Sequence, residues 1–425
     1  MTPHRPAALI TGMGAVTPIG CNVPAFTASL RAGVSGVSLL PFEDRRIKSS
    51  VAARCTGFDA TALFPQADLA RVPRLIPLAY AAALEAASQA CLPIGPALEL
   101  PQSRRIGLIL GTGGGGIDFT LSQAAAGYGG KRPSLWTITN ATHGNLAGEL
   151  SILLGLRGPS LCISTGCASS SDALGLALES LRGDRPGAPD AWIVVGADAH
   201  IRWETLAGME LLKVISTRNW RDDPSGASTA SRPFSASRDG FVLGEGAWAV
   251  VVEREESARQ REVPARARLL GYGATCDAYH RVRPDPDMAE SVRAMHLAIE
   301  DARLKPGDIG VIHYHGTSTQ LNDAVETQAV KAAFGDHARS LRGHSVKGAI
   351  GHPQGAGGLA ALVATLAALT GADGQPPFLP PTINLNDPDP ACDLDYTPNH
   401  SVPTVARTAL INCLAFGAKN SALVV

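Results

Sequence analysis

The feature that most constrains the fold is the alternation of short apolar runs with longer segments rich in alanine and leucine. The short runs are branched and bounded by glycine or proline, which predicts buried strands at Ala7–Thr11, Arg105–Leu110, Ser160–Ser164, Ala191–Val195 and Ala247–Val252. The longer segments have helical spacing and predict helices at Pro77–Ala90, Asn145–Leu154, Ser169–Leu181, Met288–Ala302 and Asp323–Phe334. This alternation is typical of an α/β fold in which helices cover parallel sheets.

One polar stretch divides the chain. Glu253–Val263 is rich in charged residues, and the alternation restarts after it at Ala267–Gly271. We therefore predict two α/β halves of similar organisation, at residues 1–255 and 264–425.

Composition excludes several classes of protein. The 37 basic and 38 acidic residues give a formal charge of −1, which disfavours a dedicated nucleic-acid binder. The longest apolar helix candidate, Gly357–Ala372, has about 16 residues and is too short for a membrane span. The first residues do not resemble a signal peptide, so we expect a cytoplasmic protein without membrane contacts. The eight cysteines contain no C-x-x-C pair, so we expect neither a disulfide framework nor a metal site.

A glycine-rich segment, Gly111–Gly116, follows a predicted strand and matches G-x-G-x-x-G. A dinucleotide site also needs an acidic residue about 20 positions later, and none occurs between Phe119 and Gly148. Close backbone packing around a turn explains these glycines better than a nicotinamide site.

Cys167 lies on the predicted turn between a strand that ends near Thr165 and a helix that begins at Ser169. The positive end of a helix dipole lowers the pKa of a thiol, which favours a nucleophilic thiolate. A buried structural cysteine is an equally good interpretation of this residue alone.

Two glycine-flanked segments add histidines to this candidate nucleophile. His313–Thr319 follows a predicted strand and contains His315, and Ser345–Gly358 places Lys347 and His352 five residues apart before an apolar helix. Their context favours a shared site with the thiol over isolated structural histidines. Other histidines lack such a context, and we expect them to be structural: His143, His200, His296 and His344.

The segment Asn412–Asn420 is a Gly/Ala turn that carries Phe416 and follows a predicted strand at Arg407–Ile411. It is either a simple hairpin turn or a loop whose backbone amide faces the nucleophile.

Together, these segments resemble the β-ketoacyl-[acyl-carrier-protein] synthases, the condensing-enzyme branch of the thiolase superfamily. The resemblance covers nearly the whole chain and includes, beyond the segments above, Ile10–Gly20, Gly155–Ser160, Ser216–Asn219, Ser231–Phe234 and Arg238–Gly246. It implies a five-layer α-β-α-β-α fold of two similar halves, with the site between them.

The resemblance also implies a mechanism. Cys167 would attack an acyl thioester and hold the acyl group, and neutral His315 and His352 would stabilise the enolate formed when a malonyl thioester loses CO₂. The enolate carbon would then attack the acyl group on Cys167. The backbone amides of Cys167 and Phe416 would form the oxyanion hole.

Supporting roles follow from the same resemblance. Lys347 would supply positive charge with Glu326 as its pairing partner, and Thr317 and Thr319 would bind the phosphopantetheine arm. We expect no cofactor of the enzyme's own, since an acyl carrier protein brings the substrates on its phosphopantetheine. We also expect a dimer, either of two identical chains or with an inactive chain-length-factor subunit.

Related enzymes differ at these positions. A thiolase would use a second cysteine in a C-terminal turn that Leu414–Phe416 does not match, although Cys413 is close by. A chain-initiating synthase would carry asparagine in place of His352, and a chain-length factor acting only as a scaffold would lack Cys167.

The acyl pocket and its gate are implied at Gly114, Met209, Leu414 and Phe416. Relatives that make saturated fatty acids commonly carry isoleucine at the position of Gly114, so we expect glycine to remove a side chain from the pocket wall.

The gate also departs from the usual pattern. Leu414 replaces an aromatic residue, and Ala415 and Ala418 replace glycines that reach positive φ freely. These changes predict a pocket for longer or bulkier chains and favour specialised polyketide or polyene assembly over housekeeping fatty-acid elongation.

Carrier proteins of this family are acidic, so basic side chains should attract them despite the near-zero total charge. The candidates are Arg71, Arg74 and Lys213.

Overall fold

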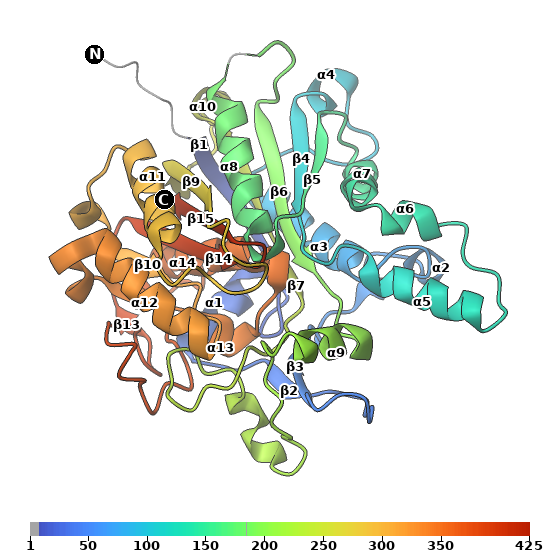
Figure 1. The fold of residues 1–425 in the computed structure, drawn as a ribbon. Helices are drawn as coiled ribbons and strands as arrows, with labels where there is room; N and C mark the ends of the chain where they lie inside the picture. Colours follow the sequence, from blue (N-terminus) through green and yellow to red (C-terminus); the bar gives the residue numbers. More distant parts are fainter. Residues whose placement is uncertain (1–7, 184) are drawn as a thin grey trace.

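The computed structural model describes residues 8–183 and 185–425, which form two mixed β-sheets with helices outside and between them (Figure 1). The first sheet has the strand order β5-β4-β6-β7-β1-β8. Its strands are β1 (Ala8–Val16), β4 (Ile106–Gly111), β5 (Ser160–Ile163), β6 (Ala191–Asp198), β7 (Gly246–Arg254) and β8 (Ala267–Leu269).

The second sheet has the order β11-β10-β14-β15-β9. Its strands are β9 (Gly271–Cys276), β10 (Val311–His313), β11 (Arg342–His344), β14 (Ala409–Ala415) and β15 (Lys419–Val424). Two small ribbons complete the strands of the described chain: β2 (Val37–Leu39) with β3 (Val51–Ala53), and β12 (Phe378–Leu379) with β13 (Val402–Pro403).

Two helices, α8 (Ser169–Arg182) and α14 (Gly357–Thr370), lie between the sheets and contact strands of both. Helices α3 (Leu75–Gln89) and α7 (His143–Leu154) cover the outer face of the first sheet. Helices α11 (Ala289–Asp301) and α12 (Gln320–Phe334) cover the outer face of the second. The predicted five-layer α-β-α-β-α arrangement is confirmed.

The remaining helices lie around these layers. They are α1 (Val23–Arg31), α2 (Gln66–Leu69), α4 (Leu100–Ser103), α5 (Ile117–Tyr128), α6 (Thr137–Ala141), α9 (Trp203–Leu211), α10 (Glu255–Gln260) and α13 (Lys347–Ile350). None of the helices in the described ranges is long and apolar enough to cross a bilayer.

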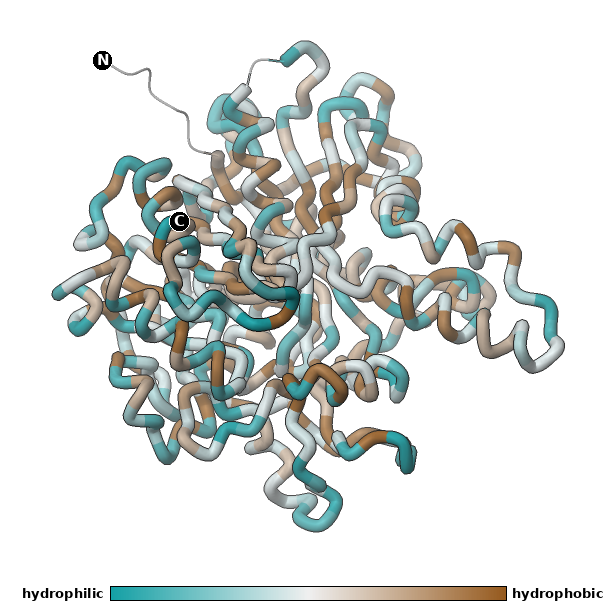
Figure 2. Tube along the Cα trace, viewed as in Figure 1, coloured by the Kyte–Doolittle hydropathy of each residue, from teal (hydrophilic) through white to brown (hydrophobic). Residues whose placement is uncertain are grey.

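Hydrophobic burial explains the layering. Figure 2 shows apolar residues concentrated along the central strands of the first sheet. All nine residues of β1 are buried, as are all eight of β6, because helices cover both faces of this sheet. Helix α14 is apolar around its circumference, and every residue from Gly357 to Ala368 is buried, as expected for a helix enclosed by two sheets.

Two predictions about the sheets need correction. The sheets are mixed, because β7 runs antiparallel to both β6 and β1, and β15 returns from β14 as a hairpin. The segment Ala267–Gly271 does not open the second half, since its first residues form β8 and pair with β1. The chain crosses between the sheets at Leu270. The division into halves at residues 1–255 and 264–425 stays a prediction.

Candidate active site

Cys167 lies on a single 3₁₀ turn, Gly166–Ala168, between β5 and α8. The turn needs a left-handed residue directly before the cysteine, and Gly166 supplies it with φ +66°. The predicted placement of Cys167 at the end of a strand and the start of a helix is confirmed. Its side chain is buried.

His315 follows β10, and buried polar groups hold its main chain on both sides. The Glu326 carboxylate of α12 accepts hydrogen bonds from the backbone amides of His315 and Gly316, at 2.6 and 2.8 Å. The ammonium of Lys347 donates to the carbonyl of His315 at 2.5 Å. These bonds fix the backbone of His315 and do not involve its imidazole.

His352 lies just after α13 and is anchored to the first half of the chain. Its backbone amide donates to the carbonyl of Val242 at 2.7 Å, and its carbonyl accepts from Gly244 at 3.0 Å. The ring packs edge-to-face on Phe241, with 5.2 Å between the centroids. A residue of the second half is thereby held by the segment that leads into β7 of the first.

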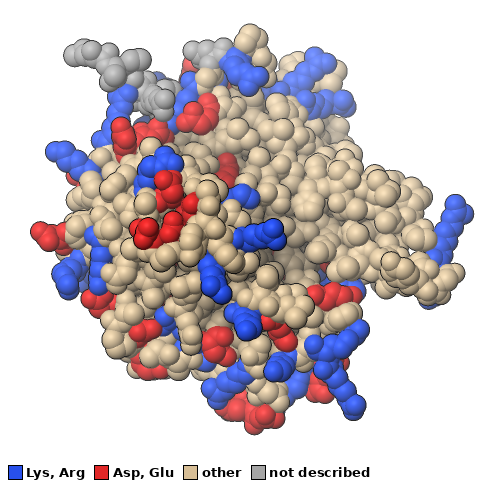
Figure 3. Space-filling view, viewed as in Figure 1, with Lys and Arg blue, Asp and Glu red and all other residues tan. Residues whose placement is uncertain are grey.

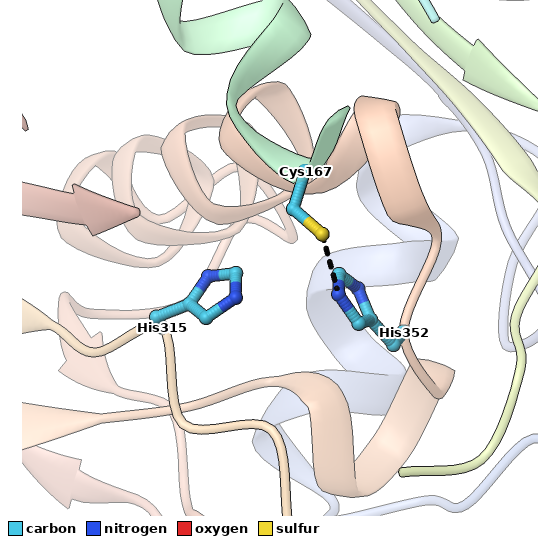
Figure 4. A group of neighbouring side chains, drawn as sticks. All are labelled: Cys167, His315 and His352. Atoms are coloured by element: carbon cyan, nitrogen blue, oxygen red, sulfur yellow. Dashed lines mark hydrogen bonds between the residues drawn. The ribbon is translucent and has the colours of Figure 1, made fainter. Parts of the chain in front are cut away.

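The three side chains meet at one point, as Figure 4 shows. The Nε2 of His352 lies 3.2 Å from Sγ of Cys167, within hydrogen-bond distance. The rings of His315 and His352 are nearly perpendicular, with centroids 5.4 Å apart. One donor atom from each residue lies within 4.8 Å of the other two.

Burial raises the pKa of the Cys167 thiol to about 11, although the backbone amides of Phe416 and Cys167 and the charge of Lys347 act in the opposite direction. The expected lowering of this pKa at the helix N-terminus is therefore wrong. Two backbone amides and Lys347 do favour the thiolate, but the loss of water around the sulfur outweighs them. The free site holds a neutral thiol.

Burial lowers the pKa of both His315 and His352 well below the usual range, and the nearby charge of Lys347 lowers it further. Both imidazoles are therefore neutral at physiological pH. A neutral ring offers one N–H donor and one free lone pair.

Phe416 lies in the hairpin between β14 and β15, so both predicted interpretations of this segment apply to the same turn. Its backbone amide faces the sulfur of Cys167 and lowers the pKa of that thiol. Ala418 has φ +62°, a conformation in which an alanine costs roughly 1–2 kcal/mol relative to right-handed backbone. Ala415, by contrast, is a regular residue of β14.

Lys347 and Glu326 are both buried but form no direct ion pair in the described part of the chain. Lys347 bonds to the His315 carbonyl instead. Glu326 accepts from two backbone amides and, at 2.6 Å, from the side chain of Asn412. The expected pairing is replaced by this indirect arrangement, in which burial raises the pKa of Glu326 to about 7.

A cavity of about 650 Å³ leads to the three side chains. Thr317 and Thr319 line it, and their hydroxyl oxygens lie 2.9 Å apart. Lys213, Leu414 and Phe416 also line it, so the structure brings most of the sequence-derived candidates to one space.

Gly114 does not leave an open space. A β-carbon there would come within 2.6 Å of Cε1 of His200, whose imidazole is buried beside the glycine. The expectation that Gly114 enlarges the pocket is therefore wrong, because a neighbouring side chain fills the volume. Met209 is not among the residues that line the cavity, but it packs against the same apolar cluster as Phe416.

Sequence reasoning missed Asp198 at the end of β6. Its buried carboxylate accepts from the Thr112 hydroxyl at 2.7 Å and from the amides of Gly113 and Gly114 at 2.9 Å. It also accepts from the amide of Gly355 at 2.7 Å, which joins the glycine-rich loop to the segment after His352. The only sequence signal was an acidic residue ending an apolar strand.

Two docking candidates lie elsewhere. The guanidinium of Arg74 pairs with the buried Glu245 at 2.7 and 3.0 Å, so its charge serves the interior. Arg71 pairs with Asp68 on the surface. Neither lines the cavity, whereas the exposed side chains of His280 and Arg283, which the sequence did not single out, do.

Cys413 is buried next to the nucleophile, and its thiol donates to the Cys167 carbonyl at 3.2 Å. It does not line the cavity. This position does not suit the second catalytic cysteine of a thiolase.

The five-layer fold and the buried Cys–His–His group define the class of protein as a thiol-dependent acyl-transfer enzyme. Residues 7–258 match the family model for the beta-ketoacyl synthase N-terminal domain, and residues 266–386 match the model for its C-terminal domain. The chain belongs to the β-ketoacyl synthase family, as the resemblance predicted.

Relatives that match over nearly their whole length belong to the same family. The 3-oxoacyl-[acyl-carrier-protein] synthase 2 of Synechocystis sp. is 37% identical over 421 residues, which cover 98% of this chain and 96% of the relative. The Coxiella burnetii enzyme of the same name is 34% identical over 419 residues, with 98% and 97% coverage.

Solved structures of ketosynthases have a similar fold. A type II polyketide synthase acyl carrier protein in complex with its ketosynthase bound to the hexaketide matches with a TM-score of 0.86, 28% identity and 99% coverage of both chains. The ishigamide ketosynthase/chain length factor matches with a TM-score of 0.85, 28% identity and the same coverage.

The contact between Gly114 and His200 gives a first prediction. Gly114→Ala should lower the free energy of unfolding by about 1–3 kcal/mol, because its β-carbon overlaps a buried ring. In a His200→Ala background the same change should cost much less. Denaturant unfolding of the four proteins measures the coupling, and an equal cost in both backgrounds would contradict it.

A second prediction concerns Lys347, whose charge favours the thiolate of Cys167. Lys347→Met should raise the pKa of this thiol further and so reduce the thiolate fraction at any fixed pH below it. Alkylation by iodoacetamide should then slow by roughly tenfold if the pKa of the thiol rises by about one. Peptide mass analysis of Cys167 over a pH series measures the rate. Lys213→Met is the matched control, because this lysine lines the cavity. If the alkylation rate of Cys167 depends on pH in the same way in both variants, Lys347 does not favour the thiolate.

Proposed function

We propose that this protein is a β-ketoacyl-[acyl-carrier-protein] synthase that condenses an acyl group held on Cys167 with a malonyl group on an acyl carrier protein. The observation that carries the proposal is the approach of Cys167 Sγ to His352 Nε2 at 3.2 Å, beside His315 and at the end of a cavity. We propose that the enzyme needs no cofactor of its own.

In the first step, the sulfur attacks an acyl thioester. Because the pKa of the thiol is about 11, its proton must leave as the S–C bond forms. His352 Nε2 is positioned to accept this proton and to return it to the departing pantetheine sulfur. The products are acyl-Cys167 and the free carrier thiol.

In the second step, a malonyl thioester loses CO₂ and leaves an enolate. Its oxygen needs hydrogen-bond donors rather than a base. The neutral ring of His315 can offer an N–H, and that of His352 can do so in the tautomer that carries its proton on Nε2. Lys347 donates to the carbonyl of His315, and Glu326 accepts from the backbone amide of His315. These two contacts would hold the ring of His315 in place.

In the third step, the enolate carbon attacks the carbonyl of acyl-Cys167. The tetrahedral oxyanion would lie between the amides of Phe416 and Cys167, where one donor is typically worth about 10²–10³ in rate. Collapse releases the 3-oxoacyl carrier. The Cys167 thiolate then takes a proton from water that enters the cavity, as its raised pKa favours.

The cavity supports substrates carried on a flexible arm. Thr317 and Thr319 present hydroxyls that can hydrogen-bond the amides of a phosphopantetheine. Exposed Lys213 and Arg283 lie on its lining, and Figure 3 shows basic side chains beside a hollow near the centre of this face. We propose that an acidic acyl carrier protein docks here.

We also propose assembly through the edge of the first sheet, with a second copy or a chain-length-factor subunit. Strand β5 is the last strand of its sheet and leaves Leu161 exposed, and Leu135, Ile138 and Ile152 are exposed nearby in sequence. The surface over β5, α6 and α7 carries few charges (Figure 3). An unpaired edge beside exposed apolar residues favours a protein partner.

The pathway is proposed as chain elongation, in specialised polyketide or polyene assembly or in fatty-acid synthesis. The relatives above include 3-oxoacyl-[acyl-carrier-protein] synthases and the ketosynthase of a type II polyketide synthase. Because Gly114 does not enlarge the pocket, the preference for specialised assembly depends on the altered gate at Leu414 and Ala418.

We propose a cytoplasmic location, because catalysis needs a free thiol and all eight cysteines are unpaired.

Acylation tests the proposed function directly. After incubation with an acyl-loaded carrier protein, the wild type should gain one acyl group on Cys167, and Cys167→Ala should gain none. Cys413→Ser removes the neighbouring buried thiol and should stay acylated. Mass spectrometry of the protein and its peptides distinguishes the outcomes; a wild type that is never acylated would indicate a scaffold subunit.

Condensation is read in the same assay after malonyl carrier protein is added. The expected products are CO₂ and a 3-oxoacyl carrier, whose chain length reports the pathway. Cleavage of acetoacetyl-CoA without any malonyl requirement would indicate a thiolase instead.

Docking gives a further prediction. Lys213→Glu and Arg283→Glu should raise KM for carrier-bound substrate severalfold, because they place negative charge where an acidic partner approaches. Arg71→Glu is the control, since this side chain lies outside the cavity lining. Raising the ionic strength should also raise KM of the wild type for carrier-bound substrate, because salt screens the attraction between the two proteins. An unchanged KM in both cavity variants would refute this docking surface.

A further inference from the structure

The thiol and imidazoles of the candidate active site also form a set of metal donors. Among the residues that the structure describes, one group of three His, Cys, Asp or Glu side chains brings its donor atoms within 4.8 Å of one another: Cys167, His315 and His352. All three side chains are buried and point toward a shared space (Figure 4). Buried donors at this separation differ from the surface clusters of carboxylates that occur without metal.

The donor types favour a particular kind of cation. Sulfur and imidazole nitrogen are the ligands of zinc, and carboxylates, which calcium and magnesium prefer, are not part of the group. Zinc bonds of about 2.0–2.3 Å in a tetrahedron place neighbouring donors roughly 3.5 Å apart. The Sγ of Cys167 and Nε2 of His352 already lie 3.2 Å apart.

The imidazoles are free to coordinate. No side-chain hydrogen bond in the described ranges engages the ring of His315, whose contacts with Glu326 and Lys347 use its backbone. The Nδ1 of His352 has no hydrogen-bond partner there either, and its Nε2 faces the sulfur. Binding a cation would therefore require the loss of only one hydrogen bond, between the thiol and His352.

The fourth position is open. The cavity of about 650 Å³ is lined by all three residues, so a cation can enter and keep a water as its last ligand. Two nearby charges oppose one another: the ammonium of Lys347 repels a cation, and the carboxylate of Glu326 attracts it. With three protein ligands and a neighbouring ammonium, we expect weaker binding than at a four-ligand structural site.

We propose that Cys167, His315 and His352 bind a zinc-like divalent cation that reversibly inhibits the enzyme. On binding, the S–H bond breaks and its proton leaves to solvent, one metal–sulfur and two metal–nitrogen bonds form, and no electrons are transferred. The coordinated sulfur can no longer attack a thioester. Acylation of Cys167 removes the thiolate ligand, so substrate and metal should exclude each other.

Cobalt(II) titration of the intact protein tests this proposal, because a thiolate ligand gives cobalt a charge-transfer band and tetrahedral sites give strong visible bands. The wild type should show these bands and saturate at one cobalt per chain, and zinc should displace the cobalt. Cys167→Ala should lose the charge-transfer band. The matched control, Cys413→Ala, removes the adjacent buried thiol and should retain it.

A chemical control protects the test against variants that do not fold. Wild-type protein alkylated at Cys167 should bind no cobalt at this site, and bound zinc should slow the alkylation. Absence of the bands in the wild type, or their persistence after Cys167 is alkylated, would overturn the proposal. The readout needs no carrier protein or malonyl substrate, so its result is independent of the condensing activity.

Discussion

The position of the active site depends on one buried carboxylate. Asp198 ends the central strand β6 and accepts four hydrogen bonds, three from the glycine-rich loop after β4 and one from Gly355 in the second half. Charge-assisted bonds of this kind are strong where water is excluded. They fix the segment that follows His352 relative to the glycine-rich loop, and the hydroxyl of Ser169, two residues after Cys167, donates to the Thr112 carbonyl of the same loop at 3.2 Å. The distance between sulfur and imidazole therefore depends on these contacts of neighbouring residues as well as on the backbone bonds of His352 itself.

Burial then determines the protonation of the site. It raises the pKa of the thiol and lowers the pKa of both imidazoles, so the free site contains neutral groups rather than a thiolate–imidazolium pair. The charges of the reaction appear only when substrate is present. Donors that are already oriented can then stabilise them without reorganising. The same neutral donors have the lone pairs that a soft cation needs.

Local patterns in the sequence predicted many of the elements and the residues of the candidate site, and long-range contacts account for much of what they did not predict. The turn of Cys167 and the glycine-flanked loops of His315 and His352 were found because strand ends and tight turns have local signals. The pairing of β8 with β1, the His200 ring beside Gly114 and the ion pair of Arg74 with Glu245 join residues far apart in the chain. The pKa of Cys167 was missed for the same reason, since desolvation depends on the whole fold.

The enclosure of α8 and α14 between two sheets has a consequence for how the molecule opens. Backbone amides exchange with solvent through local unfolding, and the segments with the most complete burial open last. Both helices begin beside the catalytic group, and α14 is buried from Gly357 to Ala368. The slowest-exchanging part of the chain should therefore adjoin Cys167 and His352, while exposed residues such as Lys213 and Arg283 line the cavity. Substrate has to come to a rigid centre, and adaptation to different chains is left to the periphery.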